Sequence, residues 1–201
     1  MNIIKLPVQT YPKRLCGPRL DVFYPVIAGG PNPSAEGMIN YTIYNTVQKL
    51  LWEQGYFQNP LANVTGGFEI KNNQRDILSL SVINYTFAGG AHGMTIIKSL
   101  TADISTGRFY KLADLFKPGS NYVEVLSNII KAQIAARDIM LLGEFTRIRP
   151  NQDFYIADKS LVIYFQLYEI TPYAYGFPYF PISVYELTDI INEKGPLARM
   201  L

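Results

Sequence analysis

The chain has 201 residues, of which 48% are hydrophobic and 17% charged, and 18 basic residues against 16 acidic ones give a net charge of +2. This composition is typical of a globular protein that buries roughly 70% of its unfolded surface without disulfide bonds. It contains no run of about 18 apolar residues to cross a bilayer, and its basic residues occur in isolated pairs such as Lys13-Arg14. Neither a membrane span nor nucleic-acid binding is therefore predicted.

The first elements are an extended segment and a long helix. Val22 to Ile27 is β-branched and aromatic, but Pro25 removes a ladder donor, which predicts an edge strand or a bulge. Asn32 before a proline has the form of an N-cap, and apolar residues then recur at helical spacing. The pattern predicts a helix from Pro33 to Gln54.

Three strands are expected next. Phe68 to Lys71 and Ile77 to Val82 flank a polar turn and predict a hairpin. In the second of these segments the apolar residues shift from even to odd positions, which predicts a bulge near Val82. Met94 to Ile104 follows as the third strand, because its even positions are mostly apolar.

The second half begins with two helical segments. Leu112 to Phe116 has the pattern of a short helical turn. Asn121 with Glu124 three residues later has the form of a capping box, and the apolar stripe behind it predicts a helix that reaches about Arg137.

A second hairpin and a closing helix complete the chain. Phe154 to Ala157 and Leu161 to Ile170 are predicted to pair around a polar turn, and Ser183 with Glu186 is predicted to cap a last helix. Because hairpins outnumber alternating strands and helices, the fold class is α+β. We expect an antiparallel sheet built from hairpins, packed against two long helices and a short C-terminal helix, in one globular domain over residues 1–201.

The most informative segment lies near the end of the predicted hairpin. Nine of the 22 residues from Tyr164 to Tyr185 are Tyr or Phe, and Glu169 is the one charged residue between Ser160 and Ser183. Prolines and glycines interrupt any periodicity, so the rings lie on an irregular connection, and such connections normally lie at the surface. The rings are either a contact surface or a loop folded back on the sheet.

Six candidate binding residues come from this segment. Glu169 either organises the loop by accepting hydrogen bonds or is partly desolvated and available for special chemistry. A glycosidase would need a second acid, and no spacing in the sequence selects one. The six candidates are Tyr168, Glu169, Pro172, Tyr173, Tyr175 and Gly176.

His92 and Gly90 are two further candidates, in the glycine-rich segment Gly89 to Gly93, which holds the single histidine of the chain. The structural interpretation is a ring that packs in a turn and bonds a backbone carbonyl. In the catalytic interpretation, His92 would work with Glu169 as an acid/base pair if the fold brought them together. The sequence contains no nucleophile motif such as G-x-S-x-G.

No metal or cofactor is predicted. One histidine and one cysteine, Cys16, lie too far apart in sequence to form a usual zinc set, and no calcium-loop pattern occurs. The glycine pairs lack the spacing of phosphate-binding loops.

The N-terminal segment Met1 to Pro7 is not predicted to be a signal peptide. Its apolar run is broken at Lys5 before an h-region of about seven residues can form. If Met1 is the native start, a cytoplasmic location is expected.

Three segments resemble the bacterial family called domain of unknown function 3298, namely Gly89 to Gly93, Leu112 to Phe116 and Tyr168 to Gly176. Upstream, Tyr24-Pro25 before a helix that contains Asn40 resembles the companion family 4163. The resemblance assigns residues 21–93 to the companion family and residues 94–192 to family 3298.

The resemblance implies a function that the residues alone do not. Relatives include lysozyme-binding ectodomains of sigma-V anti-sigma factors and accessory domains of peptidoglycan deacetylases, whose location is extracytoplasmic. The resemblance implies that this chain is a non-catalytic, envelope-related module that binds a lysozyme-like protein or a peptidoglycan-type glycan through the aromatic segment. The alternatives are an enzyme that acts on envelope polysaccharide, with Glu169 as its acid or base, and a purely structural sporulation or envelope protein. Nothing in the sequence fixes the oligomeric state.

Overall fold

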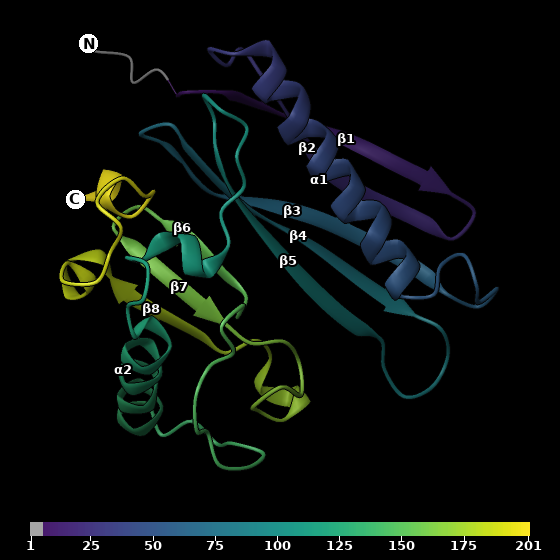
Figure 1. The fold of residues 1–201 in the computed structure, drawn as a ribbon. Coiled ribbons are helices and arrows are strands. Elements are labelled where there is room, and N and C mark those ends of the chain that lie inside the picture. The colour runs from purple at the N-terminus through teal and green to yellow at the C-terminus, as the bar shows by residue number, and fades with distance from the viewer. Residues whose placement is uncertain (1–5) are drawn as a thin grey trace, which may run out of the picture. The chain divides into compact units, whose positions relative to one another are not determined.

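A computed structural model describes residues 6–201, and these form two compact units. The first unit ends at Phe109 and the second is Tyr110–Leu201 (Figure 1). The prediction about a signal peptide falls mostly on residues 1–5, outside the described residues, and the prediction of a single domain stays a prediction. In the described part of the chain, no helix has the length and apolar character needed to cross a membrane.

The first unit is a five-stranded mixed sheet with one helix across a face (Figure 1). Its strands follow the order β1-β2-β3-β4-β5, and all neighbours are antiparallel except β2 and β3. The expected purely antiparallel sheet is therefore wrong, because α1 crosses over between β2 and β3 and returns the chain in the same direction. The elements are β1 (Gln9–Gly17), β2 (Leu20–Ala28), α1 (Pro33–Glu53), β3 (Asn63–Gln74), β4 (Ile77–Phe87) and β5 (Met94–Asp103).

The strand that contains Pro25 lies inside the sheet, not at its edge. The edge strand on this side of the sheet is β1, which the sequence pattern missed, and it pairs with β2 along its whole length, with Pro12 opposite Pro25. Pairing of β2 with β3 is confined to Leu20 to Val22. At Pro25, β2 pairs with β1 but no longer with β3. Proline is therefore tolerated at this position, because no hydrogen bond to β3 is lost.

The helix α1 forms as predicted. The Asn32 side chain accepts hydrogen bonds from the backbone N–H of Ser34 (3.0 Å) and Ala35 (3.4 Å), with Pro33 at the first helical position. The Asn32 amide also donates to the Ser105 carbonyl oxygen at 2.9 Å. One side chain therefore both starts the helix and ties it to the segment after β5.

Replacement of Asn32 by alanine is expected to lower the free energy of unfolding by about 1–2 kcal/mol, because the helix loses its cap and Ser105 loses a donor. Chemical denaturation would measure the change. Asn45→Ala is the matched control: Asn45 is an exposed residue within α1, and alanine there is the better helix former. Equal destabilisation by both substitutions would contradict this role of Asn32.

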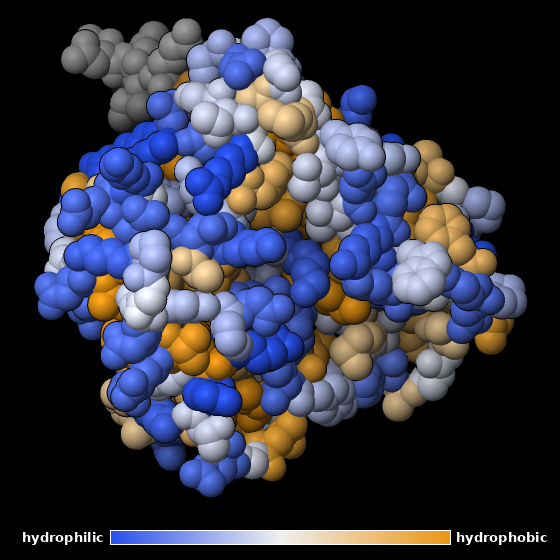
Figure 2. Space-filling view, viewed as in Figure 1, coloured by the Kyte–Doolittle hydropathy of each residue, from blue (hydrophilic) through white to orange (hydrophobic). Residues whose placement is uncertain are grey.

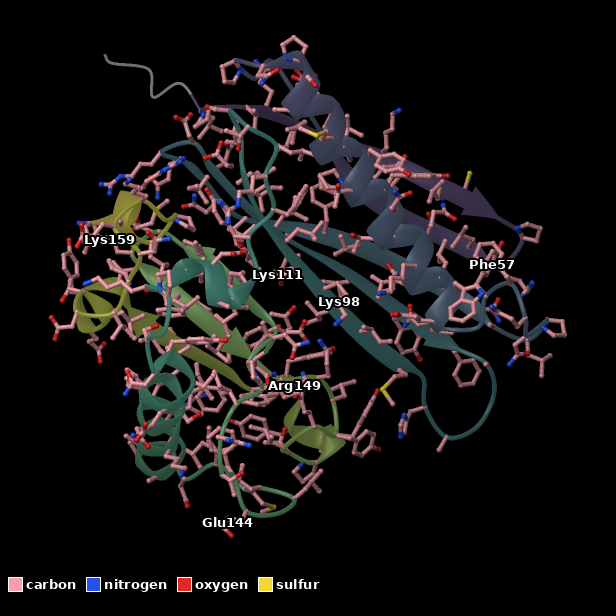
Figure 3. The ribbon with its side chains drawn as sticks, viewed as in Figure 1. Phe57, Lys98, Lys111, Glu144, Arg149 and Lys159 are labelled. Atoms are coloured by element: carbon pink, nitrogen blue, oxygen red, sulfur yellow. The ribbon has the colours of Figure 1, made fainter. Side chains whose placement is uncertain are left out.

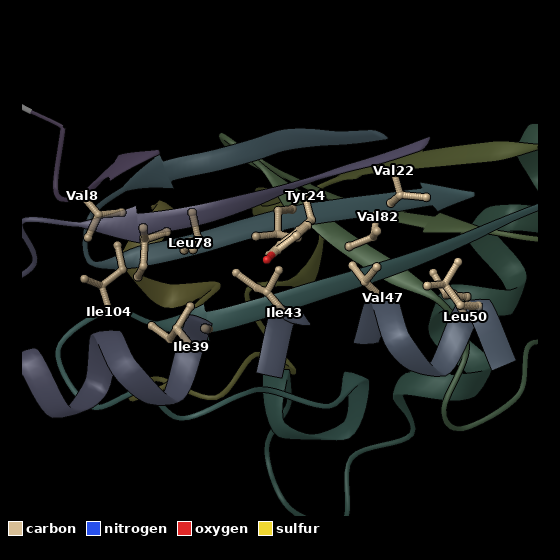
Figure 4. Packing of buried hydrophobic residues seen from close by; sticks show 14 of the residues in the cluster. Val8, Val22, Tyr24, Ile39, Ile43, Val47, Leu50, Leu78, Val82 and Ile104 are labelled. Atoms are coloured by element: carbon tan, nitrogen blue, oxygen red, sulfur yellow. The ribbon is translucent and has the colours of Figure 1, made fainter. Parts of the chain in front are cut away.

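The apolar stripe of α1 packs on the sheet in the core of the first unit. Figure 4 shows Ile39, Ile43 and Val47 of the helix facing side chains of the strands. Each of these three residues has no exposed surface. The cluster also contains Val8, Val22, Tyr24, Ile27, Leu50, Leu51, Val64, Leu78, Leu80, Val82, Ala102 and Ile104.

The predicted bulge near Val82 is wrong. β4 pairs with β5 without interruption from Ile77 to Thr86, and the irregularity lies in β3, between Ile70 and Asn72. All six residues from Ile77 to Val82 are buried, so both faces of this part of β4 are covered. A strand covered on both faces does not need to alternate apolar and polar residues. The shift of apolar residues from even to odd positions therefore did not indicate a bulge.

The second unit has its own three-stranded antiparallel sheet, β6-β7-β8, and one long helix (Figure 1). Residues 6–201 therefore form two sheets, although the sequence pattern predicted one. The elements are η1 (Leu112–Leu115), α2 (Tyr122–Ala136), β6 (Phe154–Ala157), β7 (Ser160–Tyr164), η2 (Tyr173–Tyr175), β8 (Tyr179–Ser183), η3 (Val184–Leu187) and η4 (Ala198–Met200).

The two predicted helix caps of this unit have different outcomes. The capping box of Ser183 with Glu186 is confirmed, although the helix that it starts is a short 3-10 turn. Asn121 precedes α2 but makes no side-chain cap, because its backbone (φ −86°, ψ 39°) is outside the extended region that an N-cap needs.

Surface hydropathy is mixed on the face drawn in Figure 2, where hydrophilic and hydrophobic residues are interspersed. Single exposed apolar side chains are normal in folded proteins and carry no argument on their own. Exposed aromatic rings indicate a binding site more strongly where a rigid backbone holds them beside a pocket.

Candidate functional site

Glu169 lies in the loop that follows the strand β7, five residues after its last residue. The predicted strand to Ile170 is too long, since β7 stops at Tyr164. The Gln166 N–H donates to Glu169 Oε2 at 2.7 Å, and the Glu169 N–H donates to the Gln166 carbonyl oxygen at 3.1 Å. With Tyr168 at φ 64°, these bonds close a tight turn that takes the chain out of the sheet.

The other carboxylate oxygen of Glu169 is also engaged. Arg149 Nη2 lies 2.9 Å from Oε1, and Gln152 Nε2 donates to the same oxygen at 3.1 Å. Gln152 is buried and donates in addition to the Tyr164 carbonyl oxygen at 2.9 Å. The carboxylate is thus neutralised and fixed by three groups, which supports the interpretation that it organises the loop.

The aromatic loop, which we define as Tyr168 to Phe180, divides its rings between surface and interior. Tyr168 is 46% exposed and Tyr175 is 42% exposed, whereas Phe180 has no exposed surface. Tyr173 is half-buried, and its ring centre lies 5.5 Å from that of Tyr168. The segment therefore has both exposed and buried rings, and a contact surface formed by the exposed ones stays a prediction.

Pro172 and Gly176 bound the short helix η2 within this loop. Pro172 is half-buried and precedes the first residue of η2 in an extended conformation. Gly176 follows the last one at φ 80° and ψ −146°, a backbone conformation that is open almost exclusively to glycine. The two residues therefore fix the direction in which Tyr173 and Tyr175 leave the backbone.

Arg137, at the end of α2, braces the far side of the loop. Its Nη1 donates to the Tyr179 carbonyl oxygen at 2.8 Å, and its Nη2 lies 3.5 Å from the Tyr175 hydroxyl. The guanidinium also lies over the Phe180 ring, 5.3 Å from its centre. Arg137 therefore helps to hold Tyr175 at the surface, although the sequence analysis gave this arginine no role.

A pocket of about 270 Å³ lies beside the first part of the loop. One wall comes from the irregular connection between α2 and β6, where Phe145 packs edge-on against Phe165 at 5.7 Å. In Figure 3, Glu144 lies at the tip of this connection and points away from the ribbon, and Arg149 lies farther along it. The lining residues are Leu142, Gly143, Glu144, Phe145, Thr146, Arg147, Arg149, Gln152, Phe165, Glu169 and Ile170.

The connection that carries Arg149 is held in place at several points. The Leu142 N–H donates to the Ile170 carbonyl oxygen at 2.9 Å, and the Ile148 N–H donates to Ser127 Oγ at 3.0 Å. The Tyr122 hydroxyl donates to the Pro150 carbonyl oxygen at 2.9 Å, and burial raises the pKa of this tyrosine. The pocket wall is therefore tied to both α2 and the aromatic loop.

Sequence reasoning missed Arg149, Gln152 and Phe145, although one signal pointed to the first of them. Glu169 has no charged neighbour within the segment around it, so its counter-ion had to come from elsewhere in the chain. Arg147 and Arg149 are the nearest basic residues upstream, apart from Lys159. Within residues 6–201, no cluster of three or more His, Cys, Asp or Glu side chains forms a metal site.

The remaining two candidates, His92 and Gly90, belong to the first unit. They lie in the connection between β4 and β5, where Gly90 has φ 93°. His92 Nδ1 lies 2.9 Å from the Gly93 carbonyl oxygen, the type of contact expected in the structural interpretation, and it requires the proton on Nδ1. The six loop candidates share one segment of the second unit, so the hypothesised His92–Glu169 pair is divided between the two units.

Comparisons with known proteins agree with the resemblance predicted from the sequence. Residues 113–185 match the model of the family DUF3298, described as a protein of unknown function, and residues 18–95 match the family model of the deacetylase PdaC. The aromatic loop lies within the first match and the segment that contains His92 within the second. The predicted resemblance to these families is confirmed.

Two curated proteins of Bacillus subtilis (strain 168) are similar to the chain. Peptidoglycan-N-acetylmuramic acid deacetylase PdaC is 28% identical over 134 residues, which are 63% of this chain and 29% of PdaC. Anti-sigma-V factor RsiV is 27% identical over 188 residues, which are 86% of this chain and 65% of RsiV. The chain thus spans less than two thirds of the length of either relative.

Two solved structures share the fold. A DUF3298 family member from Bacteroides fragilis has a TM-score of 0.67 at 14% identity, over 98% of this chain and 96% of that one. A DUF3298 family protein from Pseudomonas aeruginosa has a TM-score of 0.68 at 15% identity, over 94% and 95% of the two chains. At these identities the likeness concerns the fold alone.

Proposed function

We propose that this chain is a non-catalytic binding module with a role at the cell envelope, which recognises a protein or a peptidoglycan-type glycan through the aromatic loop. The names of the two similar proteins support the envelope role, since one acts on peptidoglycan and the other is an anti-sigma factor. The proposal assigns contact to Tyr168 and Tyr175, and support to Glu169 and Arg137.

The observation that carries the proposal is the exposure of Tyr168 and Tyr175 on a braced backbone. Both rings are more than two-fifths exposed, while Glu169 on one side and Arg137 on the other fix the loop. A rigid tyrosine buries a large area on binding while it freezes few torsions, which is why such residues dominate binding energy. The loop therefore needs little ordering when a ligand binds.

The adjacent pocket adds a smaller, polar contact. Its volume of about 270 Å³ is just under the usual range for ligand pockets, so it suits one side chain or one sugar ring. The Arg149 side chain is 57% exposed, and it can donate to a ligand while it keeps its contact with Glu169.

Glu169 is poorly arranged for acid catalysis. A general acid or base must reach the substrate with a carboxylate oxygen, whereas Oε1 of Glu169 is already engaged by Arg149 and Gln152, and Oε2 accepts from the Gln166 N–H. This geometry favours binding over the alternative of an enzyme with Glu169 as its acid. A purely structural envelope protein, the other alternative, would bind no ligand at this loop.

Substitution of Tyr168 or Tyr175 by alanine is expected to weaken ligand binding at least about tenfold, because each removes an exposed ring from the proposed contact. Calorimetric titration of a muramidase and of soluble peptidoglycan fragments would measure the affinities. Tyr41→Ala is the control, since Tyr41 is 68% exposed on α1 of the first unit. Wild-type affinity in both loop variants would remove the loop from the binding site.

A further inference from the structure

A second pocket, of about 460 Å³, lies in the first unit. It is formed where the C-terminal end of α1 meets the connection between β4 and β5. It has no part in the function proposed above. Its lining residues are Glu53, Gln54, Gly55, Thr86, Ala88, Gly89, His92, Gly93, Met94 and Ile96.

Two oxygens of this lining are buried and have no hydrogen-bond partner among the residues that the structure describes, namely Gln54 Oε1 and Thr86 Oγ1. Thr86 as a whole is only 8% exposed. A buried polar atom without a partner costs free energy, and such atoms are few in native proteins, so two of them in one lining need an explanation. Two residues of the pocket lining therefore each hold an enclosed oxygen that can accept a hydrogen bond.

The orientation of the Gln54 amide is set by its neighbours. Its Nε2 donates to the Asn84 carbonyl oxygen at 3.0 Å and to the Met94 carbonyl oxygen at 3.3 Å. A flipped amide would place Oε1 against two carbonyl oxygens, which repel it, so Oε1 remains the atom without a partner. An acceptor fixed in this way calls for a donor on the ligand.

The charge of the lining selects the kind of donor. Glu53 is the one acidic residue of the ten, none of which is Lys or Arg, and its carboxylate lies 3.7 Å from Lys49 Nζ in an exposed pair that solvent screens. The pocket also lies at the end of α1, where the helix dipole places a partial negative charge. These fields favour a cation over a neutral or anionic group.

The rest of the lining is apolar or adaptable. Ala88, Met94 and Ile96 offer hydrocarbon surface to the body of a ligand. Because Gln54 Oε1 and Thr86 Oγ1 are enclosed, a rim side chain must turn aside when a ligand binds. Met94 is 38% exposed and unbranched, and a methionine can change its rotamer at little cost.

We propose that this pocket binds a primary ammonium group that carries a short alkyl chain. The ammonium donates to Gln54 Oε1 and Thr86 Oγ1 within the field of Glu53, and the chain lies against Met94 and Ile96. An ammonium group has three N–H donors, and the lining residues Gln54, Thr86 and Glu53 offer acceptor oxygens to them.

The probe is n-butylammonium chloride, titrated into the full chain and followed by NMR shifts of backbone amides. We expect saturable shifts at Thr86, Gly93 and Met94, with a dissociation constant on the order of millimolar for so small a ligand. The uncharged 1-butanol and the anion butanoate, which have the same carbon chain, should bind at least about fivefold more weakly. No saturable shift, or equal affinity for 1-butanol, would overturn the proposal.

Two variants test the assigned oxygens. Thr86→Val removes the hydroxyl and keeps the shape, and it should weaken n-butylammonium binding at least about threefold. The matched control is Thr171→Val in the second unit. The Thr171 hydroxyl is also buried and has no hydrogen-bond partner within residues 6–201, and Thr171 lines neither pocket.

Glu53→Gln is a second variant, for the case that Thr86→Val does not fold, because Glu53 is exposed and its replacement should not disturb the core. It should weaken binding severalfold and reduce its dependence on salt. Unchanged affinity in Glu53→Gln, or equal losses in Thr86→Val and Thr171→Val, would overturn the proposal.

Discussion

Replacement of Gly93 by alanine is expected to lower the free energy of unfolding of the first unit by about 3 kcal/mol. A Cβ atom at this position would lie 2.4 Å from Cζ of Tyr85 and 2.5 Å from the carbonyl oxygen of Thr86. A ring can turn, but the Thr86 carbonyl belongs to β4, where Thr86 is paired with Met94 of β5. The added methyl group therefore has to displace the backbone at the end of this strand pair.

Chemical denaturation of Gly93→Ala beside Gly37→Ala would measure this effect. Gly37 is an exposed residue of α1, and a Cβ there meets no atom within 4 Å. The same substitution at Gly37 should raise stability by up to about 1 kcal/mol, because alanine is the better helix former. A Gly93→Ala protein as stable as the wild type would contradict this prediction, because the ends of β4 and β5 would then accommodate the methyl group without loss of stability.

Replacement of Glu169 by alanine is expected to lower the free energy of unfolding of the second unit by about 2–3 kcal/mol and to weaken ligand binding at least about tenfold. The change removes the acceptor of the Gln166 N–H and of Gln152 Nε2, and the counter-ion of Arg149. Arg149 is exposed and can be rehydrated, whereas the Gln166 N–H is part-buried. The turn after β7 should then open, and Tyr168 would lose its fixed position.

Amide hydrogen exchange at Gln166 and Glu169 reports this opening directly, since local protection follows the stability of the turn. Glu144→Ala is the control, because Glu144 lines the same pocket, is exposed and lies at the tip of the connection. It should change neither exchange nor stability by more than a few tenths of a kcal/mol. Unaltered protection in Glu169→Ala would show that the loop is held by other contacts.

Local signals predicted much of the fold. The helix α1 was recognisable because Asn32, Pro33 and the stripe from Ile39 to Leu51 all agree on one helix. The hairpin of β3 and β4 was recognisable as well, although the turn is tighter than expected, with Arg75 and Asp76 at φ 53° and 58°.

Non-local pairing and exposure account for the errors. β1 was missed because Gln9–Gly17 is mostly exposed and holds Pro12, so it lacks the alternation that marks a strand. The parallel pairing of β2 with β3 involves three residue pairs across a helix, and no local pattern encodes it. The residues after Tyr164 form a turn because the Gln166 N–H donates to the Glu169 side chain. The sequence alone shows an apolar run there, which predicts a longer strand.

The candidate sites show the same division. The aromatic loop could be located because nine rings crowd 22 residues, but which rings face outward depends on partners such as Arg137 that lie elsewhere in the chain. Gln54 and Thr86 gave no signal, since a glutamine at a helix end and a threonine in a strand are ordinary surface residues. The role proposed for them rests on burial of their oxygens, which only the fold decides.

The composition of β1 also bears on self-association. An open sheet edge can recruit a strand from another molecule and so begin aggregation. In β1, Pro12 offers no N–H to such a strand, and Lys13 places a positive charge next to it, while the neighbouring Arg14 is paired with Asp21 of β2 at 2.7 Å. A strand added to this edge would therefore meet an interrupted row of donors, which disfavours edge-to-edge polymerisation of the first unit.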